Sequence, residues 1–223
     1  MKNPFEIVKD FEQAIAEYTG APYVVCVNSC TNALFLAMWH YKIRVISRLI
    51  EGVNDYIEIP KRTYLSVPMQ AKMIGFKLKF TDENWSGMYQ LKPWPIYDAA
   101  RRFTKNMAAM SNQEEMCYMC VSFHWNKILG IQQGGAILHN DSIFDKWARR
   151  ARFDGRTEGV KPKDDNPILG WHMYMSPEIA AEGLVRLMHL PKYNKDLPWD
   201  DYPDLSQYEI FKSPTLIEMD LYK

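Results

Sequence analysis

The chain lacks the charge imbalance of nucleic-acid-binding domains, because 27 acidic residues match 27 basic ones among its 223 residues. We therefore expect no electrostatic attraction to nucleic acid or to an acidic membrane surface. No run of about 18 apolar residues is present that could span a membrane, and the first residues contain no apolar secretion segment. These absences predict a cytoplasmic protein with neither nucleic acid nor membrane as a partner.

Cysteine is also scarce, with four residues at positions 26, 30, 117 and 120. Only Cys117 and Cys120 have the Cys-x-x-Cys spacing of a zinc hook. They lie in an apolar run that we expect to form a strand, where residues three apart point to opposite faces. Two such thiols cannot hold one ion. We therefore expect buried free thiols and no bound metal.

Apolar residues make up 47% of the chain, enough for a sizeable core, and they follow two alternating patterns. Helical spacing occurs over 5–18, 32–48, 67–74, 141–152 and 177–190. Short strand-like runs occur over 23–27, 57–59, 77–80, 95–98, 116–123 and 136–139. This alternation predicts an α/β fold with a mainly parallel sheet and helices on both faces. We expect residues 1–190 to form this domain and residues 191–223 to form an extended tail, packed on the domain or on a partner.

Polar side chains gather at the expected carboxyl ends of the strands, where sheets of this kind bind ligands. They are Ser29, Thr31, Thr63, Tyr64, Asp98 and residues 122–127. The segment 28–31 opens a helix, so its free amides and hydroxyls suit a phosphate group. Simple capping of the helix by one such residue is the alternative.

Asp98 ends an apolar strand and is followed by two alanines, so its carboxylate is expected to be buried. A buried carboxylate needs a cation or several donors. Arg101 or Arg102 could supply an ion pair. Alternatively, Asp98 could keep the ring nitrogen of pyridoxal phosphate (PLP) protonated. At 4 Å and an effective dielectric of 20 that attraction is about 4 kcal/mol, which would keep the ring an electron sink.

Lys127 follows a strand and has apolar neighbours at Phe123, Trp125 and Ile128. Partial desolvation by these neighbours would favour the neutral amine, which can attack an aldehyde. A solvated surface lysine is the alternative. The flanking residues favour the buried and reactive form.

Several motifs at 27–34, 59–64, 98–100, 122–135 and 170–181 occur in one order along the chain. Together they resemble the DegT-type nucleotide-sugar aminotransferases, PLP enzymes with the aspartate-aminotransferase-like fold. The resemblance extends over about residues 8–190. It implies that this chain has the large domain of the PLP-dependent transferase fold.

The resemblance also implies a role for individual residues. Lys127 would carry PLP as a Schiff base and shuttle protons, and Asp98 would pair with the ring nitrogen. Tyr64 would stack on the ring. The phosphate would be held by Ser29, Thr31, Asn32 through its amide, and Ser122.

Two further positions are implied by alignment with the family. Arg101 stands where the family has a glutamine or histidine near the phenolic oxygen of PLP. His172 stands where the family has an asparagine that reaches the neighbouring subunit's phosphate. A homodimer with shared active sites is therefore expected, with His172 as the residue that crosses the interface.

The chain departs from the family in length. Between Phe80 and Tyr97 a brief connection replaces a helix, a strand and a further helix, and the usual C-terminal small domain is reduced or absent after Leu190. The resemblance implies an aminotransferase that moves an amino group from a glutamate-like donor to a keto group of a nucleotide-linked sugar. A PLP-binding non-catalytic or partner-dependent subunit is one alternative. A different PLP reaction on a small amine is another.

Overall fold

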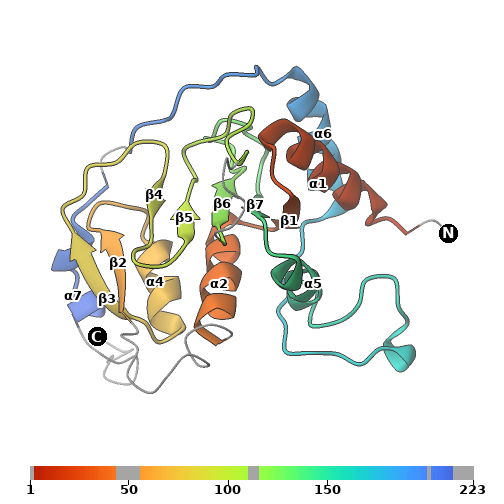
Figure 1. Cartoon of the computed structure of the whole chain (residues 1–223), viewed down its shortest axis with the longest axis horizontal. Coiled ribbons are helices and arrows are strands. Elements are labelled where there is room, and N and C mark those ends of the chain that lie inside the picture. Colours follow the sequence, from red (N-terminus) through yellow and green to blue (C-terminus); the bar gives the residue numbers. More distant parts are fainter. Residues whose placement is uncertain (1–2, 44–55, 110–115, 200–201, 213–223) are drawn as a thin grey trace.

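A five-stranded sheet in the order β1-β7-β6-β5-β4 forms the centre of the chain (Figure 1). The computed structural model describes residues 3–43, 56–109, 116–199 and 202–212. The strands are β1 (Tyr23–Val27), β4 (Tyr89–Gln90), β5 (Ile96–Asp98), β6 (Tyr118–Ser122) and β7 (Gly135–His139). A separate parallel pair, β2 (Tyr56–Pro60) and β3 (Lys77–Thr81), lies beyond β4.

The directions of the strands correct one expectation, because the sheet is mixed rather than mainly parallel. β7 runs antiparallel to both β1 and β6, and β4 runs antiparallel to β5, whereas β5 and β6 are parallel. Parallel neighbours need a long crossover, usually a helix. The connection between β6 and β7 contains no helix, so β7 returns as a hairpin. As a result β1, β5 and β6 still point the same way.

Helices cover both faces of the sheet, which confirms the α/β class. On one face lie α1 (Glu6–Thr19) and α6 (Pro177–His189), which pack side by side (Figure 1). On the other lie α2 (Cys30–Tyr41), α4 (Ser66–Met73) and α5 (Ser142–Ala151). α2 is apolar on almost every side, as a helix enclosed by a sheet and other helices must be.

Strand residues alternate between two apolar cores, one on each face of the sheet. In β6, Tyr118 and Cys120 face the core that contains α2, and Met119 and Val121 face the core that contains α1. Cys117 lies in the α1 core. The two thiols of the Cys-x-x-Cys motif therefore point to opposite faces, as expected. All four cysteines are free.

The tail after α6 crosses the top of the sheet and reaches the far side of β3 (Figure 1). Along the way Arg102 forms an ion pair with Asp196. The tail then forms a short 3₁₀ helix, Leu205–Gln207, and α7 (Glu209–Lys212). The described part of the tail is thus packed on the domain. A domain boundary at residue 190 stays a prediction.

The expected helices and strands are found with shifted ends, and the structure adds elements that were not expected: β4, two 3₁₀ helices (Pro162–Asp164 and Leu205–Gln207) and α7 in the tail, which is therefore not extended throughout. α2 ends at Tyr41 rather than at residue 48. Residues 44–48 of that expected helix lie outside the described residues. Over the described ranges no helix is long and apolar enough to cross a membrane. In the same residues no group of three or more His, Cys, Asp and Glu side chains could hold a metal ion.

A buried ion cluster ties α1 to β1 and α5. The carboxylate of Glu12, only 5% exposed, accepts hydrogen bonds from the guanidinium groups of Arg149 and Arg152 and from the backbone N–H of Cys26. Arg152 is itself buried and also donates to the carbonyl of Cys26. Because both charges are out of water, each depends on the other.

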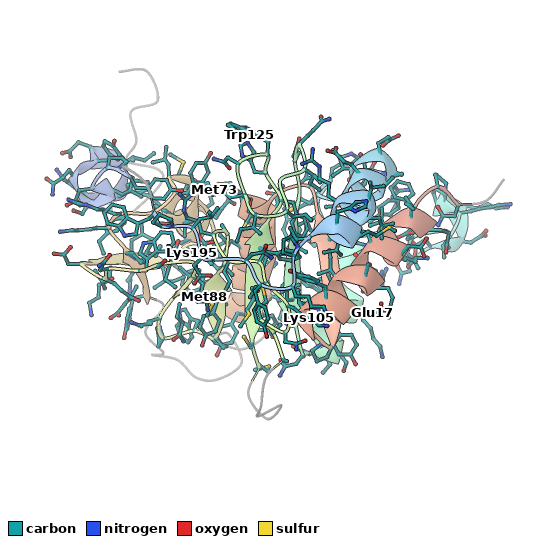
Figure 2. The ribbon with its side chains drawn as sticks, turned by 90° about the horizontal axis from the view of Figure 1, so that it is seen from above. Glu17, Met73, Met88, Lys105, Trp125 and Lys195 are labelled. Atoms are coloured by element: carbon teal, nitrogen blue, oxygen red, sulfur yellow. The ribbon has the colours of Figure 1, made fainter. Side chains whose placement is uncertain are left out.

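Replacing Glu12 by alanine is expected to lower the free energy of unfolding by about 3 kcal/mol, since the buried Arg152 loses its nearest carboxylate and, among the described residues, keeps only Glu158 at 4.0 Å. Urea denaturation measures the change. The matched control is Glu17→Ala, on the exposed side of the same helix (Figure 2), where we expect a change within about 0.5 kcal/mol. Equal losses of unfolding free energy in the two variants would show that the buried cluster stabilises the fold no more than an exposed glutamate does.

Candidate active site

A cavity of about 530 Å³ lies at the carboxyl ends of β1, β5 and β6. Because these three strands point the same way, their last residues meet at one edge of the sheet. Most of the predicted site residues line this cavity: Ser29, Thr31, Tyr64, Asp98, Arg101, Ser122 and Lys127. Residues from four separate segments thus line one cavity.

The turn between β1 and α2 forms one wall of the cavity. Ser29 is the N-cap of α2, and its hydroxyl accepts a hydrogen bond of 3.2 Å from the backbone N–H of Asn32. The Asn32 side chain donates to Asn28 at 2.7 Å and is not among the lining residues. Thr31 shares a 2.8 Å hydrogen bond with Ser66 at the start of α4. Capping is therefore observed, with the N-terminal end of α2 directed at the cavity.

A close backbone contact holds this turn against the sheet. Ser29 pairs with Gly134, and a Cβ atom at Gly135 would lie 2.5 Å from the backbone nitrogen of Cys30 and 2.8 Å from the carbonyl oxygen of Val121. No side chain fits in that space. Glycine at position 135 therefore sets the distance between the start of α2 and the end of β6.

Asp98 lies at the end of β5 with only 5% of its surface exposed. Its two oxygens accept hydrogen bonds from the Tyr89 hydroxyl at 2.8 Å and from the backbone N–H of Ala100 at 3.0 Å. Burial raises the pKa of Asp98 above its usual value. The two hydrogen bonds and the charges of Lys127 and Arg101 oppose that rise in part.

The two arginines that could have neutralised Asp98 also contact the tail. Arg102 forms its ion pair with Asp196. Arg101 is buried, donates to the carbonyl of Pro198, and has its guanidinium 5.9 Å from the centre of the Tyr202 ring. Tyr202 lines the cavity as well, so the tail contributes to the wall near Arg101.

Lys127 lies in a tight turn after β6, where its backbone N–H donates to the carbonyl of His124 at 2.8 Å. Its expected apolar surroundings are only partly present. Phe123 is fully buried, but Trp125 is 70% exposed and points outward in Figure 2. The side chain of Lys127 nevertheless reaches the cavity, close enough for its charge to lower the pKa of Asp98.

His172 lies outside this cavity. Its side chain is 71% exposed, faces Asp154 at 3.2 Å, and packs edge-on against Tyr174. The segment that carries it runs beside the end of β1, where Asn28 donates to the carbonyl of Met173. Contact of His172 with a neighbouring subunit's site stays a prediction.

The structure adds residues that the sequence did not single out for the site. Tyr89 and Trp85 come from the connection before β5, and Cys30 comes from the start of α2. Burial and the nearby Asp98 carboxylate raise the pKa of Cys30 well above its usual value, so its thiol stays neutral. In the sequence, residues 88–91 give too short an alternation to predict a strand.

Solved structures show which fold this is. The chain is similar to a PLP-dependent aminotransferase from Bacillus cereus (TM-score 0.63, 20% identity), over 82% of this chain and 58% of that one. It is similar to the sugar aminotransferase CalS13 from Micromonospora echinospora (TM-score 0.63, 16% identity), over 82% and 60%. A GDP-4-keto-6-deoxymannose-3-dehydratase variant with bound GDP-perosamine gives a TM-score of 0.65 at 17% identity, over 83% and 61%.

At these identities the likeness shows the fold, that of the PLP-dependent aminotransferases. The chain spans about 60% of the length of the structures it matches. The family profile matches residues 2–119 and 96–196, so the chain belongs to the DegT/DnrJ/EryC1/StrS aminotransferase family. No curated protein sequence matches it.

Proposed function

We propose that this chain binds PLP through Lys127 and moves an amino group from an amino acid donor to a keto group. The observation that carries the proposal is that Lys127 and Asp98, from different strand ends, line one cavity with the N-terminal end of α2. An amine, a buried carboxylate and a helix N-terminus with free hydroxyls in one cavity would suit the aldehyde, the ring nitrogen and the phosphate of PLP.

The residues present fit the cofactor. The 530 Å³ cavity is large enough for PLP with part of a substrate. Ser29, Thr31 and Ser122 offer hydroxyls beside the start of α2, and Tyr64 lies at the mouth with its ring free to stack. PLP, when bound, supplies an electron sink for the bond-breaking step.

The chain's own groups would then bind, orient and move protons. The Nζ atom of Lys127 would hold the cofactor and, once released, carry a proton between substrate carbon and cofactor carbon as a general acid–base. Asp98 would keep the ring nitrogen protonated. Arg101, which is buried and acts through its charge on Asp98, would help to hold the phenolic oxygen of PLP, as the family resemblance implies.

The substrate proposed is a glutamate-like donor and a keto group on a nucleotide-linked sugar. Family membership supports this class. So do two structural neighbours, one described as a sugar aminotransferase and one solved with bound GDP-perosamine.

A second function is a PLP-binding subunit that does not transfer amino groups by itself. It is favoured by the brief connection between β3 and β5, which offers little surface that could close over a substrate. The two proposals differ in the response to amino donors. If the protein is an aminotransferase, the yellow absorbance of bound PLP should disappear when an amino donor is added. If it is a non-catalytic subunit, that absorbance should stay.

Borohydride is expected to fix PLP to the full-length protein at Lys127, because reduction makes the bond at Nζ permanent. Mass spectrometry of the digested protein locates the label. Lys127→Ala should lose the label, and the control Lys105→Ala, which changes an exposed lysine, should keep it. Labelling of another lysine in the parent protein would overturn the assignment.

Asp98→Asn is expected to bind PLP but to react with amino donors at least about a hundredfold more slowly, since an amide holds the ring-nitrogen proton weakly. Stopped-flow absorbance with a panel of amino donors measures this half-reaction. Asp164→Asn changes an exposed carboxylate and should react at the parent rate. A parent protein that binds PLP but responds to no donor would favour the non-catalytic subunit.

We further propose a symmetric homodimer in which His172 contributes to the neighbour's site, because its side chain is exposed on the segment beside β1. Light scattering should give twice the monomer mass. His172→Ala should weaken PLP binding severalfold without changing that mass. A fully active monomer at assay concentration would contradict the proposal.

A further inference from the structure

Two hydroxyl groups, those of Tyr89 and Thr63, form a hydrogen-bonded chain that ends at the Asp98 carboxylate. The Tyr89 hydroxyl lies 2.8 Å from Asp98 Oδ2, and the Thr63 hydroxyl lies 2.6 Å from that of Tyr89. All three side chains are buried. Tyr89 touches the carboxylate and does not line the cavity, whereas Thr63 and Asp98 both do.

The antiparallel pairing of β4 with β5 puts Tyr89 there. Tyr89 and Asp98 are directly opposite in the register, and opposite residues project to the same face of a sheet. The Tyr89 ring packs against Trp85 with ring centres 4.7 Å apart, and the Trp85 indole donates to the carbonyl of Arg62. The hydroxyl position is therefore fixed by the fold rather than by the cofactor.

The direction of these hydrogen bonds follows from the chemistry of the groups. Burial and the Asp98 carboxylate raise the pKa of Tyr89 well above its usual value, so the phenol keeps its proton. A carboxylate only accepts, hence Tyr89 donates to Asp98. Tyr89 has no second proton, so Thr63 must donate to Tyr89. Both hydroxyl dipoles thus stabilise the negative charge on Asp98.

We propose that Tyr89, supported by Thr63, is a positioning residue that keeps Asp98 ionised and leaves one of its lone pairs directed at the ring nitrogen of the cofactor. This inference rests on the proposed function. A carboxylate and a pyridine ring share one proton, and whichever partner is better stabilised in its charged form decides where the proton lies. Donors to Asp98 favour the charged carboxylate and therefore the protonated ring.

Other titratable groups near Asp98 also affect where the shared proton lies, and they come from several elements that surround it. They are Lys127 after β6, Arg101 after β5, Cys30 of α2 and Cys120 of β6. Burial raises the pKa of both thiols well above their usual value, so they stay neutral. The charges of Lys127 and Arg101 remain in place when Tyr89 is changed. Tyr89→Phe therefore isolates the contribution of one hydroxyl.

The first test uses the full-length protein without cofactor, labelled with ¹³C at aspartate carboxyl carbons. The Asp98→Asn variant identifies the Asp98 resonance, and its titration midpoint is followed by NMR. In Tyr89→Phe we expect a midpoint about one pH unit higher, because a hydrogen bond to a charged group is lost. Thr63→Val should shift the midpoint in the same direction by less.

Tyr118→Phe is the matched control. Tyr118 is also a buried tyrosine that donates to a carboxylate at 2.8 Å, but its partner is Asp141, away from the cavity. This variant should leave the Asp98 midpoint unchanged. If Tyr89→Phe does not fold, Thr63→Val alone decides the question.

The second test adds PLP labelled with ¹⁵N at the ring. The ring-nitrogen resonance should move toward the unprotonated position in Tyr89→Phe, and reaction with amino donors should slow about tenfold. An Asp98 midpoint and a ring resonance equal to the parent's in folded Tyr89→Phe would overturn the inference and leave the proposed function intact. A parent protein that binds no PLP would overturn the proposed function, while the cofactor-free titration would still decide the role of Tyr89.

Discussion

The close backbone contact at Gly135 is the constraint on which the geometry of the cavity depends. β7 lies between β1 and β6, and glycine lets the start of α2 approach it to a distance that no side chain would allow. Because of this contact the hydroxyls after β1 and the turn after β6 face each other across one cavity. A side chain at position 135 would push the start of α2 away from the sheet.

Burial of the Asp98 carboxylate is the second organising feature, and it comes at an energetic cost. A carboxylate removed from water is destabilised unless donors and cations surround it. Tyr89, the Ala100 amide and the charges of Lys127 and Arg101 provide that surrounding only in part, so the pKa of Asp98 remains raised. A positively charged ring nitrogen would complete it. The buried carboxylate therefore suits a cationic partner.

Much of the site could be predicted because strand ends are local features of a sequence. Apolar runs followed by Ser29, Asp98 and Ser122 predicted polar residues at one edge of a sheet, and the structure brings them together. The reversed direction of β7 was not foreseen. The residues between β6 and β7 show no periodic pattern, and such a segment does not reveal whether the next strand runs parallel or antiparallel. Tyr89 was missed because β4 has only two residues and no pattern of its own.

By itself the sequence determined the α/β class, the longer helices and strands, the approximate positions of the strand ends and the family motifs, since each of these depends on neighbouring residues or on local periodicity. Only the tertiary structure decided which strands run in reverse and which donors reach Asp98. It also decided that the tail crosses the sheet and brings Tyr202 to the cavity. Those features depend on contacts between residues far apart in the chain, where packing and hydrogen bonding select the partner and no local pattern records the choice.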